Sequence, residues 1–435
     1  MPSVERHLGE LDLLALALDP CAPPSGHAES CPGCRARIAG LAAGREHLSD
    51  LESLATLAGD AEPPIAPASL HRLGRTLEEA ETLVRAAEDG EEALVLALAE
   101  AAGRKGFPEI ALQAAQLASR LTFRNPKRAV AFASRLREAI SASESEAESP
   151  SRLAVAASWV LESQGLLYIG ESGDAARSAL RGLAALEGAG APLLLLSHAR
   201  YYAGSALWGE SRYEDSLRFL SEACDGFARD GQDAWIGRTE AAIGLVHFSE
   251  ARFLQALRSF DAALERLDPA VDPGPVASTQ QNRAGILMNL GRLAEARAAF
   301  GSALELALRA GLGASATAIR VNLLNLGLDE GSYEEVRARG AKLVAHCDRE
   351  GLAVDAYYAR LALAEAHAAL GSYGAVRTLV EALRGDAIPE VRDDPDATAL
   401  LGRLDAGDSD EVVGRLRRLR HYLAGRDRVE AARRA

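Results

Sequence analysis

The segment from Leu207 to Ala223 reads LWGESRYEDSLRFLSEA, and the segment from Leu287 to Ala303 reads LMNLGRLAEARAAFGSA. Both contain four apolar or small residues separated by three, four and three positions. These spacings place all four residues on one face of a helix, so each segment predicts a helix that packs against a neighbour. The four positions are Tyr213, Ser216, Leu220 and Ala223 in the first segment, and Leu293, Ala296, Phe300 and Ala303 in the second.

The same pattern recurs with a constant step of 40 residues and no insertion, which predicts a repeat array. A small residue twelve positions before the second member of the pattern marks a partner helix, so each repeat is predicted to be a hairpin of two helices. Aromatic residues are only 5% of the chain, which favours closely packed helices over sheets. We therefore expect an all-α protein. The copies begin at Gly173, Tyr213, Phe253, Leu293, Tyr333 and Tyr373, the small residues are Gly204, Gly244, Ala284 and Ala364, and a drifted upstream copy is Pro126, Ala129, Ala133 and Leu136.

The pattern resembles the tetratricopeptide repeat, although its period is 40 residues and not the 34 typical of that family. The resemblance implies a right-handed solenoid of helical hairpins whose concave groove, lined by the first helix of each pair, binds a peptide or a protein. The same residues could instead be ordinary polar residues of helix surfaces. In the family register the groove residues are His198, Tyr201, Ser205, Trp208, Arg238, Gln281, Asn282, Asn322, Asn325 and Tyr358.

A second motif lies near the N-terminus, where His27, Cys31 and Cys34 form a His-x3-Cys-x2-Cys cluster. Thiolate and imidazole are the ligands that Zn²⁺ prefers in a tetrahedral site, and ligands this close in sequence can reach a single ion. A fourth ligand is required, and the candidates from the sequence are His7 and Cys21. The cluster therefore predicts a small zinc-binding helical domain.

The stretches RHLGELDLLALALDP, from Arg6 to Pro20, and HAESCPGCRARIAGL, from His27 to Leu41, resemble the zinc-containing anti-sigma domain of bacteria. The resemblance implies that His7 is the fourth ligand, that a sigma factor is the protein partner, and that the chain is a bacterial transcription regulator. Two alternatives stay open. The chain could be a scaffold or adaptor with a purely structural zinc site, or a redox sensor in which the zinc thiolates are oxidised.

The composition excludes several other functions. The net charge of −14 opposes binding to nucleic acid, and no apolar stretch approaches the roughly 20 residues that cross a bilayer. Five cysteines, unevenly placed, do not suit a secreted disulfide framework, and no known catalytic motif is present, so we expect a cytoplasmic protein that is not an enzyme.

The predicted regions are a zinc-binding domain over 1–58, a linker over 59–70, divergent hairpins over 71–150, tetratricopeptide-like repeats over 151–390, and C-terminal capping helices over 391–435.

Overall fold

The computed structural model describes residues 67–104, 106–143, 149–403 and 409–423, and every element within these ranges is an α-helix. The chain forms two compact units, residues 1–246 and 247–435. The predicted zinc ligands and the predicted linker up to residue 66 lie outside the described residues. Unit 1 contains α5 (Pro67–Asp89), α6 (Glu91–Ala102), α7 (Phe107–Leu117), α8 (Ser119–Arg124), α9 (Pro126–Ala142), α10 (Ser149–Ile169), α11 (Ser172–Gly188), α12 (Leu193–Gly209), α13 (Tyr213–Arg229) and most of α14 (Asp233–Ser249).

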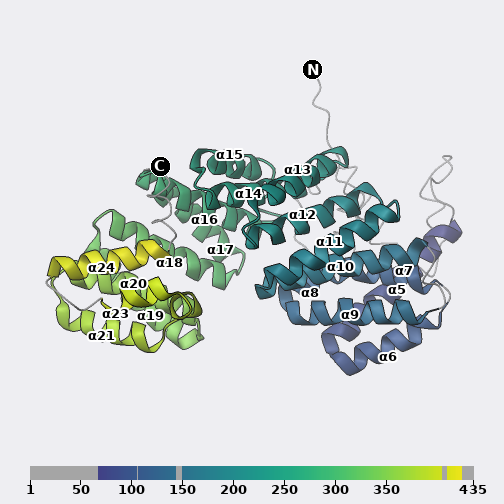
Figure 1. Cartoon of the computed structure of the whole chain (residues 1–435), viewed down its shortest axis with the longest axis horizontal. Coiled ribbons are helices and arrows are strands. Elements are labelled where there is room, and N and C mark those ends of the chain that lie inside the picture. Colours follow the sequence, from purple (N-terminus) through teal and green to yellow (C-terminus); the bar gives the residue numbers. More distant parts are fainter. Residues whose placement is uncertain (1–66, 105, 144–148, 404–408, 424–435) are drawn as a thin grey trace, which may run out of the picture. The chain divides into compact units, whose positions relative to one another are not determined.

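Unit 2 continues the series of helical hairpins after the boundary within α14 (Figure 1). No helix in the described ranges is long and apolar enough to cross a membrane. The helices of this unit are α15 (Phe253–Leu264), α16 (Pro273–Asn289), α17 (Leu293–Arg309), α18 (Gly313–Asp329), α19 (Tyr333–Glu350), α20 (Ala353–Ala369), α21 (Tyr373–Gly385), α22 (Pro389–Arg392), α23 (Pro395–Gly402) and α24 (Ser409–Leu423).

The 40-residue step predicted from the sequence is present in the helix boundaries, so the helical-hairpin solenoid is confirmed. The even-numbered helices from α12 to α20 are the first members of the hairpins, and the odd-numbered helices from α13 to α21 are the second members. First helices begin at Leu193, Asp233, Pro273, Gly313 and Ala353, and second helices begin at Tyr213, Phe253, Leu293, Tyr333 and Tyr373.

The turn inside each hairpin repeats with the same step. The residue two positions after the last residue of each first helix has a left-handed backbone, and the next amide donates to a carbonyl five residues earlier, as in a Schellman motif. These amide-to-carbonyl distances are 2.8 or 2.9 Å at Arg212, Arg252, Arg292, Ser332 and Ser372. Glycine is favoured at the left-handed position, yet two turns use other residues. The five positions are Ser211 (φ 58), Ala251 (φ 58), Gly291 (φ 73), Gly331 (φ 74) and Gly371 (φ 74).

The small residues predicted at the hairpin interface are required by close packing. A Cβ atom added to Gly204 of α12 would lie 2.7 Å from Cγ of Leu220 on α13. The hydroxyl of Ser216 donates to the carbonyl oxygen of Gly204 over 2.7 Å, so the polar atom at this buried contact is satisfied. Ser216, Leu220 and Ala223 are all fully buried. The residues of the quoted pattern therefore form the contact that joins the two helices.

The divergent hairpins before α10 use the same kind of interface. Ala129, Ala133 and Leu136 of α9 are fully buried and belong to one apolar cluster with residues of α5, α6 and α7. The drifted upstream copy of the pattern thus marks a core-facing helix, as the sequence predicts.

The last described helix, α24, packs against α20 and places charged groups in the core of unit 2. Glu365 of α20 is fully buried and accepts from Nε of Arg420 over 2.7 Å and from Nε of Arg417 over 3.1 Å. Arg420 is 4% exposed and also donates to Asp329 of α18 over 3.0 Å. Burial works to lower the pKa of Arg420, but the two carboxylates raise it above its usual value. We name Glu365, Asp329, Arg417 and Arg420 the buried ion network.

Candidate ligand-binding face

The predicted groove residues all lie on first helices, and the constant step makes their positions equivalent from one hairpin to the next. Adding 40 or 80 to the number of a residue in α12 gives the residue at the same place in α14 or α16. Tyr202, Asn282 and Asn322 therefore occupy one position in three different hairpins, and Ser205, Asn325 and Glu365 occupy another. We call the set of these equivalent positions the first-helix face.

In unit 1 this face is aromatic. The ring of Trp235 on α14 lies edge-on to Tyr201 and Tyr202 of α12, with ring centroids 5.5 and 6.5 Å apart. The guanidinium of Arg238 lies 4.9 Å from the centroid of Trp235. Burial raises the pKa of Tyr201, which keeps this phenol protonated at neutral pH. We call Tyr201, Tyr202, Trp235 and Arg238 the aromatic cluster.

His198 packs beneath the aromatic cluster. Its Nδ1 lies 2.9 Å from the carbonyl oxygen of Leu194, and its ring contacts Phe227 and Trp235 edge-on, with centroids 5.1 and 4.4 Å apart. Burial lowers the pKa of His198 to about 4, so the ring is neutral at pH 7 and Nδ1 donates to the carbonyl. The imidazole of His198 therefore packs against the indole of Trp235 and supports it from below.

The other predicted residues of unit 1 lie nearer to solvent. Ser205 is half-buried one turn beyond Tyr201, and Trp208, near the end of α12, is 36% exposed. Tyr168, at the end of α10, is 54% exposed. Partial burial and then the neighbouring Tyr201 raise its pKa, while Arg238 works to lower it, so Tyr168 lies beside the aromatic cluster. An exposed tyrosine and tryptophan at this face give a ligand apolar surface with polar edges.

In unit 2 the face carries side-chain amides. Gln281 and Asn282 of α16, and Asn322 and Asn325 of α18, are all half-buried. Within the described part of the chain, none of these four side chains makes a hydrogen bond to another residue. A half-buried amide without a protein partner is satisfied by water or by a ligand. We call these four residues the amide row.

An amide side chain both donates and accepts hydrogen bonds, as a peptide bond does. A row of such groups on successive helices can therefore bind the backbone of an extended peptide and leave its side chains free. The row ends at α20, where Tyr358 is half-buried with its ring edge-on to Tyr357, at a centroid separation of 6.2 Å. The position equivalent to Asn325 is there Glu365, which the buried ion network occupies.

Sequence reasoning missed three residues of this face. Tyr202 could have been found, because it is two periods before Asn282. Tyr168 could also have been found, because it is one period before Trp208, whereas Trp235 is not equivalent to any predicted groove residue. Metal binding by the predicted ligands His7, Cys21, His27, Cys31 and Cys34 falls outside the described residues, and among the residues that are described no group of three or more His, Cys, Asp or Glu side chains could hold a metal ion.

No known protein family matches the chain by its sequence profile, and no curated protein matches it. Solved structures do match its fold. A Rap protein in complex with Competence and Sporulation Factor is 14% identical, covers 79% of this chain and 92% of its own, and has a TM-score of 0.51. NprR in complex with its cognate peptide NprX is 13% identical, covers 80% and 96% of the two chains, and has a TM-score of 0.50.

A third similar structure is a signal transduction ATPase with numerous domains and a tetratricopeptide repeat sensor, from Pyrococcus horikoshii. It is 13% identical, with a TM-score of 0.51, and the match covers 98% of this chain and 65% of that one. At these identities the three matches establish the helical-hairpin fold alone.

Proposed function

We propose that this chain is a non-enzymatic regulatory protein that binds an extended peptide segment of a partner on its first-helix face. The observation that carries the proposal is the amide row, whose four half-buried side chains lack protein partners among the described residues. The fold match to NprR supports it, because that protein was solved with a cognate peptide bound.

Each unit, taken by itself, offers its own chemistry to a peptide segment. The amide row would bind backbone amide and carbonyl groups through paired hydrogen bonds. In unit 1, the aromatic cluster would accept apolar side chains of a peptide segment, and Arg238 would favour a carboxylate.

The experiment is selection of peptides from a displayed random library against the full chain, followed by affinity measurements on an Asn282→Ala/Asn322→Ala variant. Loss of two hydrogen bonds of about 0.5 to 1.5 kcal/mol each is expected to weaken binding by roughly 5- to 150-fold. Gln255→Ala, which removes an exposed amide from the second helix α15, is the matched control and should bind as the wild type does. Peptides that bind the double variant unchanged would refute this site.

For the N-terminal region we propose a zinc module that resembles an anti-sigma domain and binds a sigma factor. The donor set supports it, because His27, Cys31, Cys34 and either His7 or Cys21 supply the imidazole and thiolate ligands that Zn²⁺ prefers. The module would regulate transcription, with the helical array receiving the signal through its peptide.

Metal content per chain tests the zinc module. One zinc is expected in the wild type and none in Cys31→Ser, while comparison of His7→Ala with Cys21→Ser identifies the fourth ligand. Recovery of a sigma factor with the wild type, and not with Cys31→Ser, supports the regulatory function. A zinc-loaded chain that captures no sigma factor favours the scaffold, and mild peroxide that joins Cys31 to Cys34 and expels the metal favours the redox sensor.

A further inference from the structure

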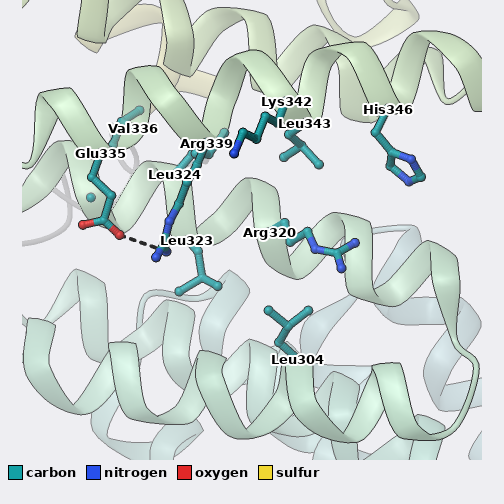
Figure 2. Close-up of a pocket in the computed structure, with 11 residues that line it drawn as sticks. Leu304, Arg320, Leu323, Leu324, Glu335, Val336, Arg339, Lys342, Leu343 and His346 are labelled. Atoms are coloured by element: carbon teal, nitrogen blue, oxygen red, sulfur yellow. Dashed lines mark ion pairs between the residues drawn. The ribbon is translucent and has the colours of Figure 1, made fainter.

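Unit 2 contains a cavity of about 510 Å³ between the second helices α17 and α19, with the first helix α18 between them. This volume lies within the roughly 300 to 1,000 Å³ range of small-molecule sites. Figure 2 shows Leu304 of α17 pointing toward the side chains of α19 across the cavity. The cavity is therefore a separate feature that the peptide proposal does not use.

The cavity and the amide row lie on opposite faces of α18. Arg320, Leu323, Leu324 and Gly327 line the cavity and follow the spacing of one helical face. Asn322 and Asn325 are rotated about half a turn from that face at 3.6 residues per turn. A ligand in the cavity would thus leave the amide row accessible.

The repeat pattern in α19 differs from that of the two preceding second helices. The third member of the repeat pattern is Phe260 in α15 and Phe300 in α17, both almost completely buried, but it is Gly340 in α19. Val336 and Leu343, on the same face of α19 as Gly340, both line the cavity. Gly340 itself does not line the cavity, because a Cβ atom added there would lie 3.3 Å from Cδ1 of Leu363 on α20; α19 meets the cavity through Val336 and Leu343.

The charged lining is basic, although the chain as a whole carries a net charge of −14. Arg320, Arg339, Lys342 and His346 line the cavity, and its one carboxylate, Glu335, pairs with Arg339 over 2.9 Å. Among the described residues, Arg320, Lys342 and His346 have no ion-pair or hydrogen-bond partner. Two permanent positive charges and an imidazole thus line an apolar cavity without an ion-pair partner in the described part of the chain.

The apolar lining is aliphatic, made of leucine and valine side chains without an aromatic ring. Charge complementarity selects an anionic head group, and the lining selects an aliphatic body. We infer that this cavity binds a small anionic amphiphile, with its carboxylate or phosphate head between Arg320 and Lys342 and its chain against Leu304, Leu323 and Val336.

The test is calorimetric titration of the full chain with dodecanoate below its micellar concentration, with dodecanol and dodecyltrimethylammonium as comparison probes. Dodecanoate should bind with a stoichiometry of one, and the uncharged and cationic probes should bind at least about tenfold more weakly, because they cannot make charge-assisted hydrogen bonds to Arg320 and Lys342. Dodecyl phosphate distinguishes the head group, since tighter binding than dodecanoate assigns a phosphate and weaker binding a carboxylate.

Two variants make the test specific. Arg320→Gln/Lys342→Gln should weaken dodecanoate binding by about tenfold or more, whereas Arg309→Gln/Arg349→Gln, which removes equal charge from exposed positions of α17 and α19, should bind normally. Leu304→Trp should abolish binding by filling the cavity, with circular dichroism verifying that each variant is folded.

Three results would overturn the inference. The first is that dodecanoate does not bind. The second is that the Arg320→Gln/Lys342→Gln variant binds dodecanoate as tightly as the wild type, and the third is that the wild type binds dodecanol as tightly as dodecanoate. Binding of an acidic leucine-containing peptide in place of dodecanoate would also overturn it, because the occupant would then be a protein segment. Peptide binding at the amide row does not enter any of these outcomes, so the two proposals fail independently.

Discussion

Replacement of Arg420 by methionine should destabilise unit 2, because it leaves the fully buried Glu365 with Arg417 as its remaining cation. Removing one partner of a buried ion pair costs about 3 to 5 kcal/mol. Arg417 still reaches Glu365 over 3.1 Å, but its side chain is 44% exposed. Because Arg417 still pairs with the Glu365 carboxylate, we expect a loss near the lower limit, about 3 kcal/mol.

Urea unfolding of wild type and variants measures this loss, and hydrogen exchange of α24 shows whether the helix detaches before the rest of unit 2 unfolds. Arg420→Met/Glu365→Leu should recover about 2 kcal/mol relative to Arg420→Met, because the uncompensated charge is gone. Arg418→Met is the matched control, since Arg418 is exposed on the same helix. The reasoning is refuted if Arg420→Met costs no more than Arg418→Met, or if the double variant recovers nothing.

Three further predictions concern the hairpins. Ser211→Gly should raise the free energy of urea unfolding by about 1 kcal/mol, because it removes a serine from a left-handed backbone position. Gly291→Ala should lower that free energy by a similar amount, and a change of the same sign in both variants would contradict the reasoning. Gly204→Val should cost about 1 to 3 kcal/mol because its Cβ meets Leu220, and adding Leu220→Ala should restore part of that loss in thermal unfolding. Because the pKa of His198 falls from 6.5 to about 4 on folding, the stability present above pH 6.5 is lost as pH falls toward 4. Between pH 7 and pH 5 the loss should be about 2 kcal/mol, and the pH dependence of urea unfolding should be smaller in His198→Gln.

The sequence predicts the hairpins well because their interfaces depend on short-range spacing. Gly204 and the pattern that begins at Tyr213 lie on the two helices of one hairpin, with a single turn between them. The contact between these helices therefore recurs at the same step as the sequence pattern. The left-handed turn positions follow the same step, including Ser211 and Ala251, where residue type alone would not indicate them.

The buried ion network could not be predicted in this way. Glu365 and Arg420 are 55 residues apart, and they meet only because α24 folds back onto α20. From the sequence, the arginines of the C-terminal helix indicate a solvated face, because charged residues are rarely buried without a partner. The packing angle between α20 and α24 decides which arginine pairs with Glu365. The periodic pattern does not specify that angle.

The candidate site was predicted in register but not in detail. The first-helix face follows from the family resemblance, so Asn282 and Asn322 could be named from the sequence. His198 has the same register, yet its ring packs against Phe227 and Trp235 because α12 and α14 approach closely at that point. The cavity beside α18 was not predicted, since a spacing rule does not show whether neighbouring helices close a gap.

The uniform length of the hairpins has a consequence for how such a chain can change over generations. Any block of 40 residues that starts and ends at equivalent left-handed turns carries one whole second helix and the whole first helix that follows it. A tandem duplication or deletion of one block within the gene would therefore join compatible surfaces, since stacked repeats contact mainly their neighbours. Lineages could thus lengthen or shorten the array of first helices by whole repeats, and substitute the side chains of one repeat at a time, while the protein keeps folding.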